Sequence, residues 1–467
     1  MTPHSASFWP GGGRLRNALD NRETSDFNRR IVLEAIRRND RMARADISRL
    51  TGLTPPAVGR IVARLIEEGF VVEAGRRKAE AGQPPKALAL NPDAAFTVGL
   101  HLDYEGITGV LVDLAGRPRA QRTLSRDDPS PEQALADLIA MHDDLVAEAG
   151  ITAGDLLGIG LVSVGPIDMA SGSVQRPPYL PAWESVPLRR ELSAATGLPV
   201  LLDNNATAAA VGEWWYGAAG GYDDFLYGYL GHGIGGGLFL GGRIHRGALS
   251  NAGELGHVIV APDGPACACG SVGCLEAVAS LYALKRDLGA AVAATDRLDA
   301  AVNDGDPALT AWLDKAAEYL ARAVTSATNL LDLEAFVLGG RPSARVLRHL
   351  ADGVRGRLHT MTMRGRLAPP AVVLGRTGPD IAALGAATLP VYGAFAPADA
   401  LGERWPATRR PGARAVEAVM GVTRPGAAGC ARRGGGPAQA GARHENRPSP
   451  SHNGRPGHQQ ERGEETS

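Results

Sequence analysis

Four residues in the middle of the chain have the types and spacing of a metal site. Cys267, Cys269 and Cys274 fall within eight residues, and His257 lies ten residues before the first of them. Three thiolates and one imidazole suit a closed tetrahedral zinc site, and the intervening glycines let the backbone fold tightly round an ion. In a reducing compartment this clustering indicates metal binding rather than disulfides. We therefore expect structural Zn²⁺ on these four residues; the alternative is a set of core cysteines without metal beside a surface histidine.

The first ninety residues have the pattern of a DNA-binding head. Apolar spacing predicts helices over 26–39, 45–50 and 55–68, and strands over 70–73 and 86–90. Thr54 can cap the third helix, Pro55 suits its first position, and Gly69 can end it. Helix, helix, turn, helix and hairpin together are the plan of a winged helix-turn-helix.

Six residues of this head are candidates for DNA contacts. The exposed positions at the start of the third helix would face base edges in the major groove, and the basic loop of the hairpin would face phosphates. Residues 1–90 also carry 16 basic and 10 acidic residues, which favours a polyanionic partner. The alternative to a DNA-binding head is a helical domain that binds protein. The alternative explanation of the charge balance is an unevenly charged surface. The candidate residues are Thr54, Ala57 and Arg60 on the helix, and Arg76, Arg77 and Lys78 in the wing.

The rest of the chain predicts an α/β body between two irregular ends. Strands alternate with helices, which implies sheets covered by helices. We expect domains at 26–90 and 91–394, a flexible arm at 1–25, and a disordered Gly/Pro/Arg-rich tail at 395–467. The predicted strands are 96–102, 107–113, 156–164, 198–202, 225–230, 237–240 and 335–338, and the predicted helices are 131–149, 206–216, 311–331 and 378–389.

The cysteine segment also resembles a known family signature. The segment is similar to the signature of the ROK family, which comprises sugar-responsive bacterial repressors, uncharacterised open reading frames and sugar kinases. The residues that match are Gly256-His257, nine residues, then Cys267-x-Cys269-Gly270-x-x-Gly273-Cys274-x-Glu276. The resemblance extends over about 26–394 and includes Gly52-Leu53-Thr54, Gly82–Pro85, Val337–Gly340 and Leu384–Ala387. It implies two actin-like α/β lobes of the ribonuclease H and sugar-kinase type with a ligand cleft between them. A preceding winged helix marks the repressor branch.

Three elements that a sugar kinase of that family needs are altered in this chain. His101 stands where the first phosphate loop has Asp, and Asp103 stands where it has Gly. His232 replaces Thr in the second glycine loop, Gly231–Gly237. Asn205 holds the position of the Asp that takes the proton from the attacking hydroxyl, and an amide cannot act as that base. We therefore expect no enzyme activity and no catalytic residues; a ROK-type ATP-dependent sugar kinase with a DNA-binding head is the alternative.

The positions that contact the sugar in the family hold suitable polar residues in this chain. The resemblance carries five sugar contacts to this chain, and amides and carboxylates can each bracket two vicinal hydroxyls. His257 would link the two sites, with one ring nitrogen on zinc and the other toward a hydroxyl. A dimer scaffold with a vestigial cleft is the other alternative. The expected sugar-binding residues are Asn204, Asn205, Glu254, His257 and Glu276.

Composition and charge agree with a regulator that has two kinds of module. Of the 467 residues 44% are apolar, but no run of 18 apolar residues lacks a charge, so we expect no membrane span. The first thirty residues have no secretion pattern, which predicts a cytoplasmic protein. The sequence thus predicts a transcriptional repressor of double-stranded operator DNA, controlled by a sugar or sugar derivative. It would act as a homodimer or homotetramer and bind no membrane.

Overall fold

The structure of the protein is a computed structural model. The described residues are 21–39, 41–76, 86–104, 106–126, 129–177, 182–293, 295–361, 368–378 and 380–396. Residues 1–20 of the expected arm, Arg77 and Lys78 of the expected wing, and the expected tail beyond 396 lie outside them. Within the described residues, no helix combines the length and the apolar character that a membrane span requires.

The head has the expected order of elements. It contains α1 (Asn21–Arg38), α2 (Arg44–Thr51), α3 (Pro55–Glu67) and the antiparallel pair β1 (Val71–Arg76) and β2 (Lys86–Leu90). Gly52 ends α2 with a φ of +71°, as the turn before α3 requires. Buried residues of the three helices form its core: Val32, Ile36, Ile47, Val58, Val62 and Leu65. The helix α1 begins at Asn21 rather than at 26, so the expected arm is shorter. The segment Asn-Arg-Glu-Thr-Ser has no apolar residue to mark it as helical.

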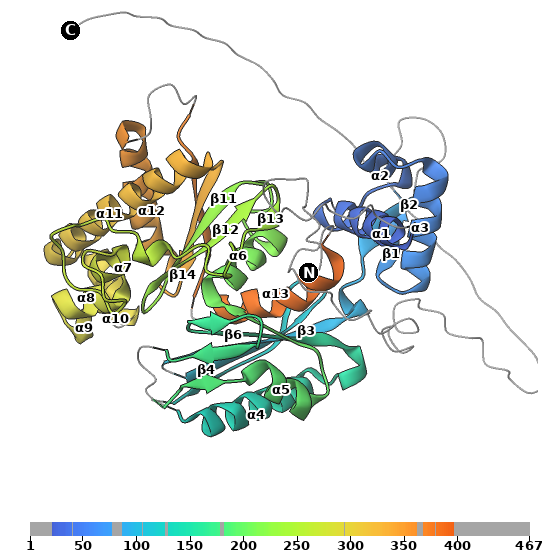
Figure 1. Cartoon of the computed structure of the whole chain (residues 1–467). Coiled ribbons are helices and arrows are strands. Elements are labelled where there is room, and N and C mark those ends of the chain that lie inside the picture. The colour runs from blue at the N-terminus through green and yellow to red at the C-terminus, as the bar shows by residue number, and fades with distance from the viewer. Residues whose placement is uncertain are drawn as a thin grey trace, which may run out of the picture. The chain divides into compact units, whose positions relative to one another are not determined.

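Two five-stranded sheets form the body, and both follow the same plan (Figure 1). In each, three strands form an antiparallel meander, and two further strands lie parallel to the first. The strand orders are β5-β4-β3-β6-β10 and β13-β12-β11-β14-β15. This repeated order confirms the expected pair of actin-like lobes. The strands are β3 (Phe96–Asp103), β4 (Gly106–Asp113), β5 (Pro118–Ser125), β6 (Leu156–Ser163), β10 (Val200–Asn204), β11 (Phe225–Leu230), β12 (Ile234–Leu240), β13 (Arg243–Ile244), β14 (Ala335–Gly340) and β15 (Ala371–Thr377).

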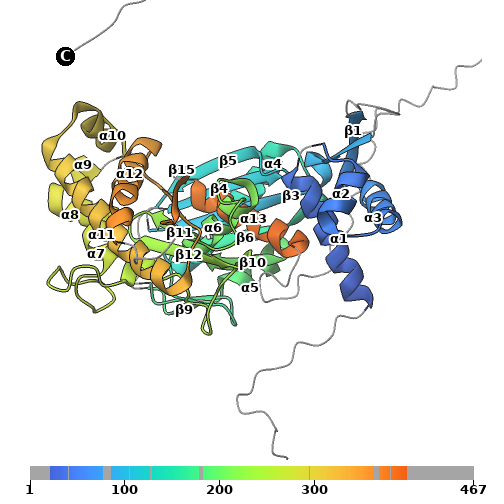
Figure 2. The ribbon, with the colours of Figure 1, turned by 90° about the horizontal axis from the view of Figure 1, so that it is seen from above.

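Helices cover the outer faces of both sheets, as Figures 1 and 2 show. Helices α4 (Pro131–Ala149) and α5 (Leu188–Thr196) pack on the first sheet. Helix α12 (Ala344–Met361) packs on the second sheet, next to α11 (Pro307–Leu331). The remaining elements are short: η1 (Pro92–Ala94), η2 (Ala153–Asp155), β7 (Ile167–Asp168), β8 (Ser173–Gln175), β9 (Ser185–Val186), η3 (Leu255–His257), α7 (Leu275–Ala279), α8 (Leu281–Leu288), α9 (Ala290–Ala293) and α10 (Thr295–Asp304).

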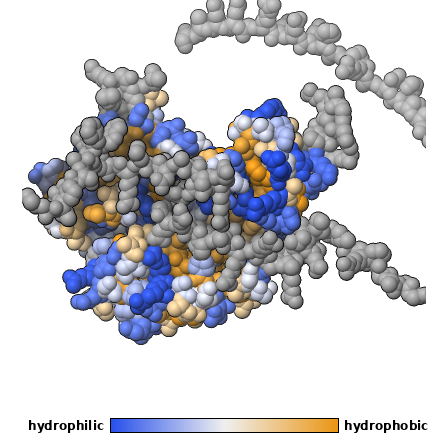
Figure 3. Space-filling model, turned by 45° about the vertical axis from the view of Figure 1, so that its right-hand side comes forward, coloured by the Kyte–Doolittle hydropathy of each residue, from blue (hydrophilic) through white to orange (hydrophobic). Residues whose placement is uncertain are grey.

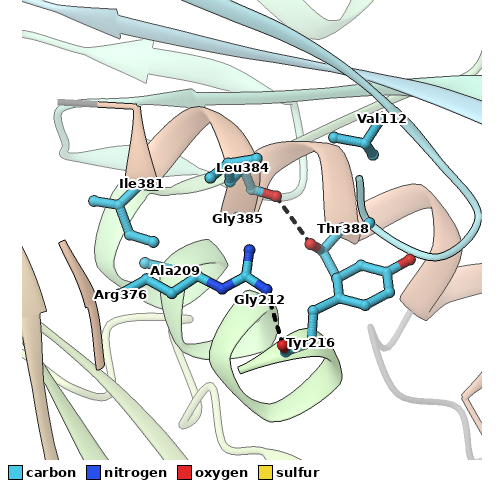
Figure 4. Close-up of a pocket in the computed structure, with 10 residues that line it drawn as sticks. Val112, Ala209, Gly212, Tyr216, Arg376, Ile381, Leu384, Gly385 and Thr388 are labelled. Carbon is cyan, nitrogen blue, oxygen red and sulfur yellow. Dashed lines mark hydrogen bonds between the residues drawn. The ribbon is translucent and has the colours of Figure 1, made fainter. Parts of the chain in front are cut away.

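Helices α6 (Asn205–Tyr216) and α13 (Ile381–Phe395) connect the two sheets. A Cβ on Gly160 of β6 would lie 1.8 Å from the carbonyl oxygen of Ala386, so α13 lies directly on the first sheet. A Cβ on Gly237 of β12 would lie 2.4 Å from Ala210 Cβ, so α6 lies equally close to the second sheet. The two helices contact each other at Gly212 and Gly385 (Figure 4). The glycines therefore set the close packing through which the lobes meet.

Several elements differ from the expectations. Strand β12 begins at Ile234 and runs through the glycines that the sequence placed in a loop, because Gly235–Gly237 are strand residues pressed against α6 and η3. The last helix, which the sequence predicts to begin within 378–389, spans Ile381–Phe395 and continues through Pro390. Elements β5, α5, α12 and β15 were not predicted at all.

Exposed hydrophobic side chains are scattered. On the face seen in Figure 3, hydrophobic residues lie in small groups between hydrophilic ones. The most exposed large ones, Leu50, Leu249 and Leu330, come from α2, a loop and α11. Scattered exposed leucines are ordinary for a protein surface and do not mark an interface.

Candidate functional site

The four predicted metal ligands converge in one loop. One ligand atom from each of His257, Cys267, Cys269 and Cys274 lies within 4.8 Å of the others. The sulfurs of Cys269 and Cys274 are 3.7 Å apart, and Cys267 Sγ is 3.8 Å from His257 Nδ1. A tetrahedral ion with Zn–S bonds of about 2.3 Å would separate its donors by about 3.8 Å. This Cys₃His cluster is therefore compatible with a structural metal.

The backbone conformation of the loop brings these four residues together. Bridges pair Ile259 with Cys274 and Ala266 with Val272, which folds the segment back on itself. Gly273 has a φ of +73°, and a Cβ there would lie 1.6 Å from the carbonyl oxygen of Ala261. No other residue could take that place without moving the backbone. The glycine next to Cys274 thus positions one of the four predicted metal ligands.

Two acidic candidates for sugar binding lie beside the Cys₃His cluster. His257 presents Nδ1 to the cysteines, and its Nε2 lies 3.9 Å from a carboxylate oxygen of Glu254. Desolvation and the negative charge of Glu276 raise the pKa of Glu254, against the opposing effect of His257. Cys274 caps α7, and Glu276 lies in the first turn of that helix. Glu254, His257 and Glu276 are therefore neighbours around one loop.

Asn204 and Asn205 come from the first lobe and lie near the start of strand β12 of the second lobe. Asn204 ends β10 and caps α6, where its Oδ1 accepts the backbone N–H of Ala206 at 2.8 Å. A Cβ on Gly235 would lie 3.9 Å from Oδ1 of both asparagines. On the other side, Glu276 Oε2 accepts the N–H of Ile234 at 3.0 Å. The five predicted sugar residues thus gather around the first residues of β12.

Two of the positions that depart from the kinase pattern make contacts across the two lobes. Asp103, the last residue of β3, pairs with Arg341, which follows β14, at 2.9 Å. The ring of His232, after β11, lies 5.4 Å from that of Tyr104, centroid to centroid. Side chains thus join the lobes at the positions where the family resemblance places the phosphate loops. Sequence reasoning missed Arg341, although it directly follows the Val337–Gly340 motif.

His101 is a buried base beside this ion pair. Its side chain is 2% exposed, and its Nε2 has no hydrogen-bond partner among the described residues. Burial lowers the pKa of His101, and Arg341 adds to that effect, while Asp103 opposes it. The imidazole is therefore held neutral, and it replaces an ionised carboxylate of the kinase pattern with an uncharged ring.

A second buried ion pair braces the strand that ends at the asparagines. Arg246 binds Asp203 with two hydrogen bonds, of 2.6 and 3.0 Å, and the Asp203 side chain is 4% exposed. Bidentate pairs of this kind fix geometry as well as charge. Arg246 lies beyond β13 of the second sheet, whereas Asp203 belongs to β10 of the first. This pairing could not be predicted, because 43 residues separate the partners.

The head presents part of its predicted DNA surface. Thr54 and Arg60 are exposed on α3, and Ala57 is half-buried. Thr54 precedes Pro55 at the helix start, as expected, but its side chain makes no capping hydrogen bond. Arg76 ends β1 opposite Lys86. Arg77 and Lys78 lie outside the described residues, so their predicted phosphate contacts stay predictions.

Comparison with known proteins matches both parts of the chain. The model of the ROK family matches residues 97–391, and a model described as winged helix-turn-helix DNA-binding matches residues 28–72. The xylose repressor of Caldicellulosiruptor bescii is 36% identical over 262 residues, which are 55% of this chain and 65% of that protein. The glucokinase of Thermotoga maritima is 38% identical over 199 residues, 39% of this chain and 63% of the enzyme. This chain thus spans about two thirds of the length of each.

Solved structures agree with the fold. A ROK family transcriptional regulator, a homologue of the Escherichia coli MLC protein, matches 80% of this chain and 98% of its own at a TM-score of 0.65 and 24% identity. The ROK glucokinase of Streptomyces griseus, solved with glucose and AMPPNP, matches 63% of this chain and 99% of its own at 0.55 and 29%. Because the family model matches more than half of the chain, this protein belongs to the ROK family and carries an amino-terminal winged helix.

Proposed function

We propose that this protein is a DNA-binding transcriptional repressor, controlled by a sugar or sugar derivative in a cleft that does not transfer phosphate. One observation carries the proposal. On a chain with a winged helix, the kinase positions hold Asn205 in place of a base and an Asp103–Arg341 pair between the lobes. Such a cleft retains groups for hydroxyls but lacks the group that would deprotonate one.

The head would read DNA through α3 and its wing. Thr54, Ala57 and Arg60 would face base edges, and Arg76, Arg77 and Lys78 would bind phosphates. Two heads of a homodimer or homotetramer would then contact a palindromic operator in the cytoplasm. The relatives named as xylose repressors and the winged helix-turn-helix match at residues 28–72 support this reading.

The effector would bind where the five polar residues gather around β12. Asn204, Asn205, Glu254, His257 and Glu276 would accept and donate hydrogen bonds to vicinal hydroxyls. Zn²⁺ on His257, Cys267, Cys269 and Cys274 would supply no redox or acid chemistry, but would fix the loop and the direction of the imidazole. Because of the relatives' names, D-xylose is the first effector to test, followed by D-glucose.

The test is binding of the purified protein to duplexes tiled across its own promoter region, with and without each sugar. We expect tight binding to one duplex and release by one sugar. Replacing Arg60 by Ala should weaken that binding by about 5- to 150-fold, which corresponds to the usual 1–3 kcal/mol of a base contact, and should leave zinc content unchanged. Failure to bind any of the duplexes would refute the proposed function.

A sugar kinase is the second candidate, because the glycines of Gly231–Gly237 remain and glucokinases are among the relatives. Incubation with ATP and a panel of hexoses and pentoses separates the two. We expect no ADP above a no-sugar control; turnover would overturn our interpretation of Asn205. If no sugar raises the melting temperature, the cleft is vestigial and the body serves only as a scaffold.

A further inference from the structure

One helix of the body reaches from the candidate sugar site to the DNA-binding head. We propose that the carboxyl-terminal end of α6, with Trp214 and Trp215, is the contact through which the cleft acts on the head, and that Arg37 and Arg38 of α1 receive it. This inference rests on the proposed function, since it names how a bound sugar would reach the operator-binding surface.

The first turn of α6 lies in the candidate sugar site. Asn204 caps the helix, and Asn205 is its first residue. A ligand that binds these two amides therefore touches the start of a helix of 12 residues, which spans about 18 Å. The helix is closely packed along this length: residues 206–211 are all buried, and Ala206 and Ala210 lie against the glycines of β12. A shift at its first turn would move the helix as a whole.

The last turn of α6 is joined to α1 by stacked arginines. Trp214 and Trp215 are only 4% and 3% exposed. The guanidinium carbon of Arg37 lies 4.1 Å from the centroid of the Trp215 ring, and that of Arg38 lies 4.6 Å from Trp214. Arg37 also donates a hydrogen bond to the carbonyl oxygen of Trp215. Stacking depends on the distance and tilt of the planes, so these contacts report small movements of α6.

A buried carboxylate holds both arginines in place. Glu34 Oε1 lies 2.6 Å from Arg37 Nη2 and 2.5 Å from Arg38 Nε. Burial alone would raise the pKa of Glu34, but its contacts with Arg37 and Arg38 lower it overall, so the carboxylate is ionised at neutral pH. On the same helix, Val32 and Ile36 are buried in the core that includes residues of α3. A displacement of the arginines would thus be passed to α3, the helix that we propose faces the DNA bases.

Helix α13 supports the same contact. Its Phe395 ring packs edge-on against Phe70 of the head, with the centroids 5.2 Å apart, and Arg30 donates to the carbonyl oxygen of Ala396 at 3.0 Å. In Figure 4, α13 lies against α6, and Arg376 donates to the carbonyl oxygen of Tyr216 in the last turn of α6. The ends of both interlobe helices therefore meet the head together.

The experiment measures coupling rather than binding alone. For the full-length protein, operator affinity is measured with and without saturating sugar (D-xylose or D-glucose, whichever raises the melting temperature), and sugar affinity is measured without DNA. We expect the sugar to change operator affinity by about 5- to 150-fold in the native protein. In Arg37→Lys/Arg38→Lys, which keeps both charges but loses the planar stack, this factor should fall to below 3-fold, while sugar affinity changes by less than 3-fold.

Two further variants make the outcome decisive. Arg190→Ala removes an exposed arginine of α5 that pairs with its neighbour Glu191, far from the stacked arginines in sequence, and it should keep the native factor. Trp215→Phe keeps an apolar ring with a smaller face and should also lower the factor. It replaces the double variant in the test if melting temperature and zinc content show that the double variant does not fold. A folded double variant or Trp215→Phe variant that keeps the native factor would overturn the inference. Failure of the native protein to bind operator or sugar would instead refute the proposed function.

Discussion

The ion pair between Asp103 and Arg341 should hold the two lobes together, and its removal offers a quantitative test. The partners are 2.9 Å apart, and their side chains are 14% and 25% exposed. Replacing Arg341 by Met keeps much of its volume but leaves the Asp103 carboxylate without this cation. His101 and Tyr229, both buried beside the pair, offer no positive charge in its place, because His101 is held neutral.

The size of the effect follows from the burial of the pair. Two unit charges about 4 Å apart attract by about 4 kcal/mol at an effective dielectric constant of 20. Desolvation of the partners offsets part of this attraction, and breaking a fully buried pair typically costs about 3–5 kcal/mol. For a pair that is partly open to water, we expect Arg341→Met to lower the free energy of unfolding by about 2–3 kcal/mol.

A double-mutant cycle isolates this interaction from other effects of each substitution. The free energy of unfolding is measured in urea for the native protein, Asp103→Asn, Arg341→Met and the double variant. We expect a coupling energy of about 1–3 kcal/mol, because removing both partners leaves no unpaired charge. A coupling energy below about 0.5 kcal/mol would show that the pair does not hold the lobes together, and our account of this edge of the cleft would be wrong.

Three other predictions test the site and the fold. Burial lowers the pKa of His101, so near pH 6 the unfolded chain binds a proton that the folded protein does not bind. The free energy of unfolding should therefore fall as the pH drops from 7 to 5. His101→Gln should reduce this pH dependence in urea unfolding. Cys274→Ser should lower the zinc content seen by elemental analysis and the melting temperature, whereas Cys430→Ser should change neither. Gly160→Ala should lower the free energy of unfolding in urea by about 3 kcal/mol, the upper end of the usual cost of overpacking, because its Cβ would meet the Ala386 carbonyl oxygen at 1.8 Å. An unchanged midpoint would contradict the packing of α13 on β6.

Features with local determinants could be predicted from the sequence. The convergence of His257 with the three cysteines follows from their spacing within one loop, and α3 follows from Pro55 at its start and the apolar spacing behind it. Strands β3, β4, β6 and β11 are almost entirely buried, so their apolar runs are visible without a structure. In each case the residues that define the element are neighbours in the chain.

Features that depend on distant contacts could not be predicted. Strand β5 is mostly exposed and carries Arg119 and Arg122, so its sequence lacks an apolar pattern, and pairing with β4 defines it. In sequence the glycines at the start of β12 resemble a loop, and the close approach of α6 and η3 explains why they belong to a strand. The pairing of Asp103 with Arg341 joins residues 238 positions apart, and nothing near either residue indicates the other.

These interactions bear on why a cleft of this type would sense rather than catalyse. In a phosphate-transferring cleft, the anion that lies between the lobes comes from the nucleotide, and closure depends on its presence. Here the chain supplies its own anion, Asp103, and its own cation, Arg341, so the lobes are joined with no nucleotide in place. Closure would then vary only with what binds at the remaining polar residues, on the side of Asn204, Asn205 and Glu276. We infer that this exchange of an external anion for an internal one removes the reaction and leaves the sugar as the variable that the cleft can report.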